Sequence, residues 1–306
     1  MPDVILLITP FVILATVLAA ARFVGCSFDS SGLGGGWDYD GTVLAHPNLV
    51  AYWRLGEAAG VPTATDQTGA HDGSYETAML AENAPGQSAA TASPPLLELG
   101  AVGMIASEAA HTSLRVDGGY VEVPFNAALN PPQFSVEAWV SAEWDAAEVL
   151  SNGLKPFRAV CSSREVAAGG TRGFTLYAGP DSTNLADSTV YWQVWVGDDG
   201  ASWQILLGPA VEVDQITYLG VTYDGTTLKL YVNGSQDEAG AANAQMNVAV
   251  VANTASPLYI GMGAPEAPTP QFPFKGRLQE VALYNAALTP TVIDNDRVLP
   301  GMTTGP

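Results

Sequence analysis

The stretch YDGTTLKLYVNG, residues 223–234, decides the fold of this chain. An Asp-Gly pair near its start and an Asn-Gly pair at its end are typical of two-residue hairpin turns, where both positions need positive φ. Asp224 is therefore expected to form a turn rather than to act as a catalytic acid. Together with the alternating run 216–225, the stretch predicts a meander of antiparallel strands, with three side chains of the returning strand facing the core: Leu228, Leu230 and Val232.

The same alternation recurs throughout the chain after residue 45, whereas long helical periodicity is scarce. In the run 133–142, Glu137 and Trp139 fall on the face opposite to that of Phe134 and Val136. The runs are rich in β-branched and aromatic residues, which favour strands. We therefore predict an all-β fold, an antiparallel two-sheet jelly-roll sandwich. Its expected strands lie at 120–124, 133–142, 171–179, 189–197, 202–208, 216–225, 227–234, 257–263 and 274–288.

Composition narrows the possible partners. The 306 residues carry 31 acidic against 11 basic side chains, a formal net charge of −20. Phosphate contacts need Lys and Arg, so no nucleic-acid partner is expected. Many carboxylates are available for calcium instead. Cys26 and Cys161 are the two cysteines, and no spacing rule decides whether they pair.

The N-terminus carries an uncharged apolar run of 18 residues, 4–21, followed by Arg22. A helix of this length reaches about 27 Å, enough for a bilayer core. Three interpretations stay open: a retained membrane anchor, a segment cleaved or lipidated at Cys26, and a helix buried among the subunits of an assembly. We expect one hydrophobic helix within residues 1–26, a Gly/Ser-rich tether over 27–44, and a β domain over 45–306. The anchoring side chains would include Val4, Leu7, Phe11, Leu14 and Leu18.

Several strings in succession resemble the laminin-G-like, concanavalin A-like domains of bacterial and viral surface proteins. The resemblance covers about residues 48–296. It implies a two-sheet jelly roll used in carbohydrate or protein binding, in adhesion, or as a structural addition to enzymes and virions. The strings that carry it are VAYWRLGE (50–57), ATDQTGAHDGSY (64–75), SLRVDGGYVEVP (113–124), LNPPQFSVEAWV (129–140), LGVTYDGTTLKLYVNG (219–234), LYIGMG (258–263) and FKGRLQEVALYNAALTPTVI (274–293).

The resemblance also implies a calcium site, often a structural one. Related sequences often have two acids where this chain has Gln279-Glu280, so one charge is missing here. The candidate ligands are Glu57, Asp66, Gln279 and Glu280, with a backbone carbonyl near Asp72. The alternative is that Asp66 and Asp72 only shape glycine-containing turns.

The same superfamily holds glycoside hydrolases with a Glu-x-Asp-x-x-Glu signature, and EWDAAE at 143–148 matches it literally. On a strand, Glu143 and Asp145 would share one face while Glu148 points to the other, and the segment follows a complete strand. We therefore expect a solvated loop and no catalysis. The three histidines (46, 71 and 111) show no metal-binding spacing.

Three tryptophans are candidates for ligand binding. Trp192 and Trp195 lie three residues apart and so point to opposite faces of one strand, and Trp203 follows on the next run. An exposed indole could stack on a sugar, whereas a buried one packs between the sheets. We predict a non-catalytic recognition or adhesion module on a cell or virion surface. The alternatives are a structural component of a virion or filament, with residues 4–21 packed among neighbouring subunits, and a glycosidase using Glu143, Asp145 and Glu148.

Overall fold

The structure is a computed structural model. It describes residues 38–77, 96–145, 148, 156–167, 169–184, 188–237, 239–263 and 271–302. The apolar run 4–21, with Val4, Leu7, Phe11, Leu14 and Leu18, lies outside these residues, and so does Cys26. Within the described ranges, no helix is long and apolar enough to cross a membrane.

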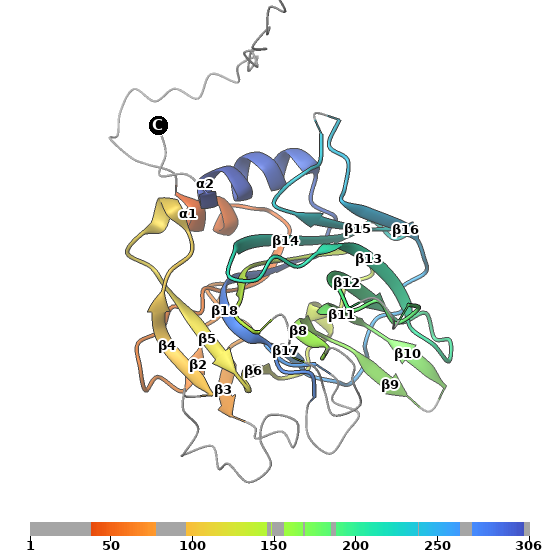
Figure 1. The fold of residues 1–306 in the computed structure, drawn as a ribbon, viewed down its shortest axis with the longest axis horizontal. Helices are drawn as coiled ribbons and strands as arrows, with labels where there is room; N and C mark the ends of the chain where they lie inside the picture. Colours follow the sequence, from red (N-terminus) through yellow and green to blue (C-terminus); the bar gives the residue numbers. More distant parts are fainter. Residues whose placement is uncertain are drawn as a thin grey trace, which may run out of the picture. The chain divides into compact units, whose positions relative to one another are not determined.

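Two antiparallel sheets of eight strands each make up the described part of the chain, as predicted (Figure 1). Their inner faces share one apolar core. Sheet A has the order β16 (Ala244–Asn247), β15 (Thr227–Val232), β14 (Ile216–Tyr223), β7 (Phe134–Ala142), β18 (Lys275–Tyr284), β5 (Thr112–Asp117) and β4 (Leu97–Val102), and β1 (Leu49–Trp53) also pairs with β18.

Sheet B forms the second layer, and a small hairpin extends from it. Its order is β13 (Gln204–Ala210), β12 (Val190–Val196), β11 (Phe174–Pro180), β8 (Arg158–Ser162), β17 (Leu258–Ile260), β6 (Gly119–Val123), β3 (Gly73–Thr77) and β2 (Thr63–Ala64). The hairpin consists of β9 (Glu165–Ala167) and β10 (Gly170–Arg172).

The stretch 223–234 forms the predicted hairpin, but its first turn differs from the expected one. Asp224, Gly225 and Thr226 connect β14 to β15, and Gly225 has a positive φ, of 95°, whereas Asp224 does not. The Asp224 carboxylate accepts the backbone N–H groups of Thr226 and Thr227 at 2.9 and 2.7 Å, as expected of a turn-forming residue. The inward prediction is confirmed: Leu228 and Leu230 are buried, and Val232 packs against the core.

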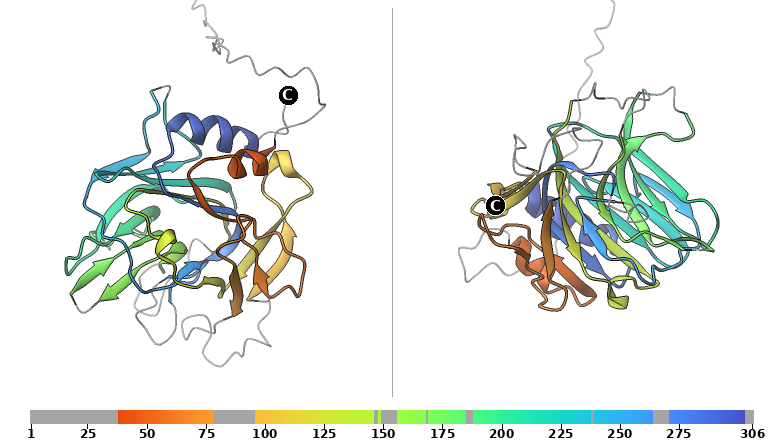
Figure 2. Two further views of the ribbon diagram at one scale, coloured as in Figure 1. Left: turned by 180° about the vertical axis from the view of Figure 1, so that it is seen from behind. Right: turned by 90° about the horizontal axis from the view of Figure 1, so that it is seen from below.

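Strand β7 is buried on both faces, because helices cover the outer face of sheet A. All nine of its residues are buried, including Glu137 and Trp139. The covering elements are α1 (Tyr39–Leu44) and the C-terminal helix, a π-helical segment (Val292–Val298) that continues into α2 (Leu299–Met302). The two lie side by side over the sheet (Figure 2). Sequence analysis did not predict these short helices, and it assigned the residues of α1 to the tether.

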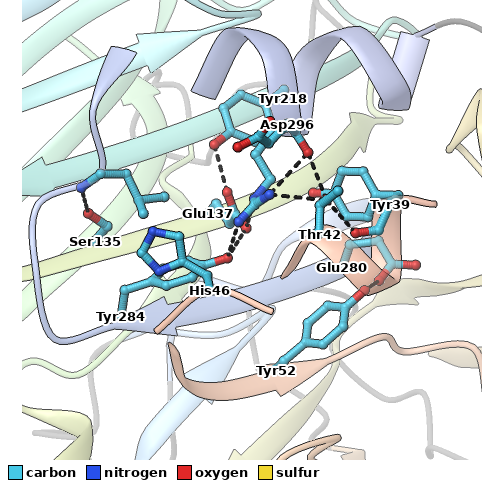
Figure 3. Close-up of polar contacts among 12 residues, drawn as sticks. Tyr39, Thr42, His46, Tyr52, Ser135, Glu137, Tyr218, Glu280, Tyr284 and Asp296 are labelled. Atoms are coloured by element: carbon cyan, nitrogen blue, oxygen red, sulfur yellow. Dashed lines mark hydrogen bonds and ion pairs between the residues drawn. The ribbon is translucent and has the colours of Figure 1, made fainter. Parts of the chain in front are cut away.

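The C-terminal helix is held on sheet A by a buried ion pair. Arg297 is fully buried, and its Nε donates to Glu137 Oε1 at 2.9 Å. Glu137 also accepts the hydroxyls of Tyr218, at 2.8 Å, and Tyr284 (Figure 3). Burial alone would lower the pKa of Arg297, but the adjacent Glu137 carboxylate outweighs it, and the pKa is raised. The arginine is therefore charged at every physiological pH.

Three further contacts bring the helices close to the sheet. Arg297 donates to the Thr42 hydroxyl of α1 at 3.2 Å, so one guanidinium joins both helices to β7. Gly301 lies directly against the ring of Trp139, where an added Cβ would come within 1.9 Å of the indole. Trp139 Nε1 in turn donates to the Tyr39 hydroxyl at 2.9 Å.

Replacing Arg297 with alanine should lower the free energy of unfolding by about 3–5 kcal/mol, because Glu137 would stay buried without its partner. Urea denaturation followed by tryptophan fluorescence measures the change. Arg172→Ala is the matched control, since Arg172 pairs with Asp199 at the surface. It should leave the unfolding curve almost unchanged. Equal effects of the two substitutions would contradict the role assigned to Arg297.

Candidate functional site

Four aromatic rings gather on the outer face of sheet B, and we call them the aromatic cluster. Trp195 lies on β12 and Tyr177 on β11, and their ring centroids are 5.5 Å apart in an edge-to-face arrangement. Phe157 precedes β8 and lies 5.4 Å from Trp195, while Phe272 lies 5.8 Å from Tyr177. Tyr177 is buried, whereas the other three rings are partly exposed.

Polar groups hold the cluster in place. The Trp195 indole N–H donates to Gln193 Oε1 at 2.7 Å, and the Gln193 amide donates to the carbonyl of Gly179 at 2.8 Å. Arg164 donates to the Tyr177 hydroxyl at 2.8 Å, and its guanidinium lies 4.5 Å from the centre of the Trp203 ring. The cluster thus combines aromatic surface with a buried cation, an arrangement that suits a ligand with apolar faces and hydroxyl groups.

The three predicted tryptophans differ in exposure. Trp195 is partly exposed within the aromatic cluster, and Trp203 is partly exposed against Arg164, which donates to Tyr177 of the cluster. Trp192 is 1 % exposed and packs in the core between the sheets. Because Trp192 has no ring face open to a ligand, the structure removes it from the candidate set.

Asp66 organises the loop between β2 and β3. Its two carboxylate oxygens accept the backbone N–H groups of Tyr52, Thr68, Ala70 and His71 at 2.8–3.1 Å, and also the Thr68 hydroxyl. Burial alone would raise the pKa of Asp66, but these hydrogen bonds outweigh it and lower the pKa. Such a saturated carboxylate has little capacity left for a cation.

Gln279 and Glu280 lie side by side because β18 bulges between Gln279 and Ala282. Glu280 adopts a left-handed conformation with φ of 54°, so its side chain and that of Gln279 meet on the buried outer side of sheet A. Gln279 Oε1 accepts the backbone N–H of Met104 at 2.7 Å, and Glu280 bonds to the Tyr52 hydroxyl (Figure 3).

The four predicted calcium ligands already form hydrogen bonds with other groups of the chain. Glu57 accepts the backbone N–H of Thr65 at 2.9 Å and also bonds to the Tyr75 hydroxyl. The Asp66 oxygens are taken up by their loop, and the Gln279 carbonyl by Met104. Ca²⁺ needs 6–8 oxygens converging on one point. Calcium binding through these residues stays a prediction.

Glu280 instead converges with two residues that sequence analysis did not combine. Asp40 of α1, His111 and Glu280 each offer a ligand atom, and these atoms lie within 4.8 Å of one another. The side chains of His111 and Arg54 also line an open polar cleft of about 300 Å³. No spacing rule could have found this group, because its members lie on three separate elements and meet only through the bulge in β18.

Glu143 and Glu148, the two glutamates of the EWDAAE segment, form ion pairs with different arginines. Glu143 forms ion pairs with Arg115 and Arg277 at 2.8 and 2.7 Å. Glu148 forms an ion pair with Arg158 of β8 at 2.8 Å. Each glutamate is therefore neutralised by arginine in a separate set of contacts.

Asp66→Asn should lower the free energy of unfolding by about 1–3 kcal/mol, since an amide NH₂ would replace an oxygen that now accepts N–H groups. The native pKa lies below the ordinary 3.8, so Asp66 stabilises the fold above that pH and loses its contribution as pH falls through the native value. The gap between wild type and variant should therefore narrow below pH 3.8 in urea denaturation. Asp72→Asn, whose carboxylate accepts the Asp66 backbone N–H, is the control and should have a smaller effect. A gap that does not depend on pH would contradict this assignment.

Comparisons with known proteins agree with the architecture. Domain 4 of the GH43 extracellular arabinanase AbnA from Geobacillus stearothermophilus, solved with arabinotriose, is 18 % identical, with a TM-score of 0.51. The similarity covers 81 % of this chain and 98 % of the arabinanase domain. Trypanosoma rangeli sialidase, solved with the inhibitor DANA, is 17 % identical, with a TM-score of 0.48. That similarity covers 84 % of this chain and 32 % of the sialidase chain. No curated protein matches. Residues 116–294 match the family described as the concanavalin A-like lectin/glucanases superfamily. The chain therefore belongs to the concanavalin A-like lectin/glucanase superfamily.

Proposed function

We propose that this protein is a non-catalytic recognition module that binds carbohydrate through the aromatic cluster on sheet B. The observation that carries the proposal is the partial exposure of Trp195 and Trp203, which are linked through Tyr177 and the buried Arg164. Aromatic faces stack on the apolar faces of sugar rings, and a fixed guanidinium can donate to their hydroxyl groups. The N-terminal apolar run would hold the module at a surface.

The fold supports this proposal without deciding it, because one fold serves many functions. Glu143 and Glu148 are each paired with arginine, which disfavours the roles of nucleophile and acid that a glycosidase needs. The similar arabinanase domain was solved with arabinotriose, so arabino-oligosaccharides are a reasonable first probe.

Substituting Trp195 with alanine should weaken carbohydrate binding by roughly tenfold or more, because the stacking surface is lost. A glycan array that includes arabinotriose selects the ligand, and isothermal titration then measures its affinity for each variant. Trp203→Ala should act in the same direction. Phe125→Ala removes an aromatic ring that is 38 % exposed outside the cluster and should leave the affinity unchanged. Tm measurements identify variants that fail to fold.

Two outcomes would refute the proposed site. One is ligand binding that survives both tryptophan substitutions. The other is the absence of binding to any glycan while Tm and fluorescence show a folded protein.

The protein should not hydrolyse arabinan, sialosides or other glycans, because neither glutamate of the EWDAAE segment is free to act. Release of reducing sugars from a polysaccharide panel tests this expectation. The variants Glu143→Gln and Glu148→Gln should give the same background as the wild type. Activity in the wild type that disappears in both variants would establish a glycosidase.

A further inference from the structure

The group formed by Asp40, His111 and Glu280 has too few hydrogen-bond partners for its polar atoms. The Tyr52 hydroxyl contacts both Asp40 Oδ1, at 2.8 Å, and Glu280 Oε2 (Figure 3 shows the Tyr52–Glu280 contact). A phenol has one proton to donate, so it cannot donate to both carboxyl groups. Glu280 is 1 % exposed, and its other oxygen accepts the Gln279 amide at 3.0 Å.

His111, the histidine of the group, also lacks a full set of hydrogen bonds among the described residues. His111 Nδ1 is a buried atom without a hydrogen-bond partner among the described residues, and it lies 3.9 Å from Asp40 Oδ2. The other ring nitrogen, Nε2, lies 3.7 Å from Glu108 Oε2. A carboxylate on the far side of an imidazole commonly orients the ring of a metal-binding histidine. The lone nitrogen thus faces the two carboxylates of the group.

Acidic groups outnumber basic ones around the group. Among the described residues, Arg54 is the cation that contacts it, with Nη1 at 2.9 Å from Asp40 Oδ2. Asp40 and Glu280 belong to the group itself, and Glu108 lies on the far side of His111.

We propose that Asp40, His111 and Glu280 bind a divalent transition-metal ion such as Zn²⁺. Imidazole nitrogen with carboxylate oxygen is a donor set that suits zinc, whereas calcium prefers oxygen alone. A divalent ion would balance the charge, satisfy the lone His111 nitrogen and relieve the shared Tyr52 proton. Arg54 and Glu108 would orient Asp40 and His111 from behind.

The position of the group gives the ion a path and a structural role. His111 lines the open cleft of about 300 Å³, so the site can be reached from solvent. Asp40 belongs to α1, Glu280 to β18, and His111 to the loop before β5. A bound ion would therefore fasten α1 to the sandwich. Asp40 and His111 lie outside the residues 116–294 that match the family, whereas Glu280 lies within them.

The experiment uses the full chain, stripped with a chelator and titrated calorimetrically with ZnCl₂ and with CaCl₂. Zinc should bind at one saturable site in the wild type, more tightly than calcium. A hundredfold excess over Kd should raise Tm by about 5 °C. His111→Ala should abolish both effects, and Glu280→Gln should weaken them strongly. Glu108→Gln should weaken zinc binding by about tenfold, as expected of a positioning residue.

His71→Ala is the matched control, because the His71 backbone carbonyl accepts the Trp53 indole N–H, and its side chain forms no hydrogen bond or ion pair with the described residues. It should bind zinc like the wild type. X-ray absorption at the zinc edge should show mixed nitrogen and oxygen ligands. The inference fails if the wild type binds no zinc. In that case one of the carboxyl groups is protonated, and its proton takes the place that the ion would occupy. It also fails if His111→Ala binds as tightly as the wild type, or if calcium is preferred.

Discussion

The buried ion pair between Glu137 and Arg297 makes a third layer necessary in this protein. A carboxylate at the middle of a central strand is tolerated inside a fold only when it is paired and hydrogen-bonded. Arg297 and two tyrosines satisfy Glu137, and they do so only when the C-terminal helix lies on sheet A. Arg297 then reaches Thr42 and brings α1 onto the same face. The pair contributes specificity of docking more than raw stability, since apolar residues of similar volume could serve the latter.

Closing the outer face of sheet A has consequences for both candidate sites. Helices cover that face, so a ligand would have to bind to the outer face of sheet B, where the aromatic cluster lies. The docking of α1 also carries Asp40 to Glu280 and His111. The proposed recognition surface and the proposed metal site therefore lie on opposite sheets, and one can be altered without the other. The proposed ion would stabilise the layer that the Glu137–Arg297 pair positions.

Local pattern predicted most strands because the alternation has a period of two and is read directly from neighbouring residues. All nine expected runs contain strands, although several additional ones, such as β4 and β8, were not predicted. The short α1 and the C-terminal helix escaped detection. Six residues are too few to establish helical periodicity, and the C-terminal helix begins with seven π-helical residues that do not follow the 3.6-residue period. The outward position of Glu137 and Trp139 was also predictable, but their burial was not, since burial depends on a distant helix.

By itself, then, the sequence determined the all-β class, the inward side chains of the meander, the order of strings that indicates the superfamily, and the acidic character that disfavours nucleic acid. Only the tertiary structure decided which tryptophan is buried, because two residues three apart on a strand differ in face but not in sequence signal. It also decided where Glu280 points, since a bulge with positive φ reverses the alternation at that residue. The Asp40–His111–Glu280 group exists for the same reason: its members are far apart in the chain and are joined only by packing.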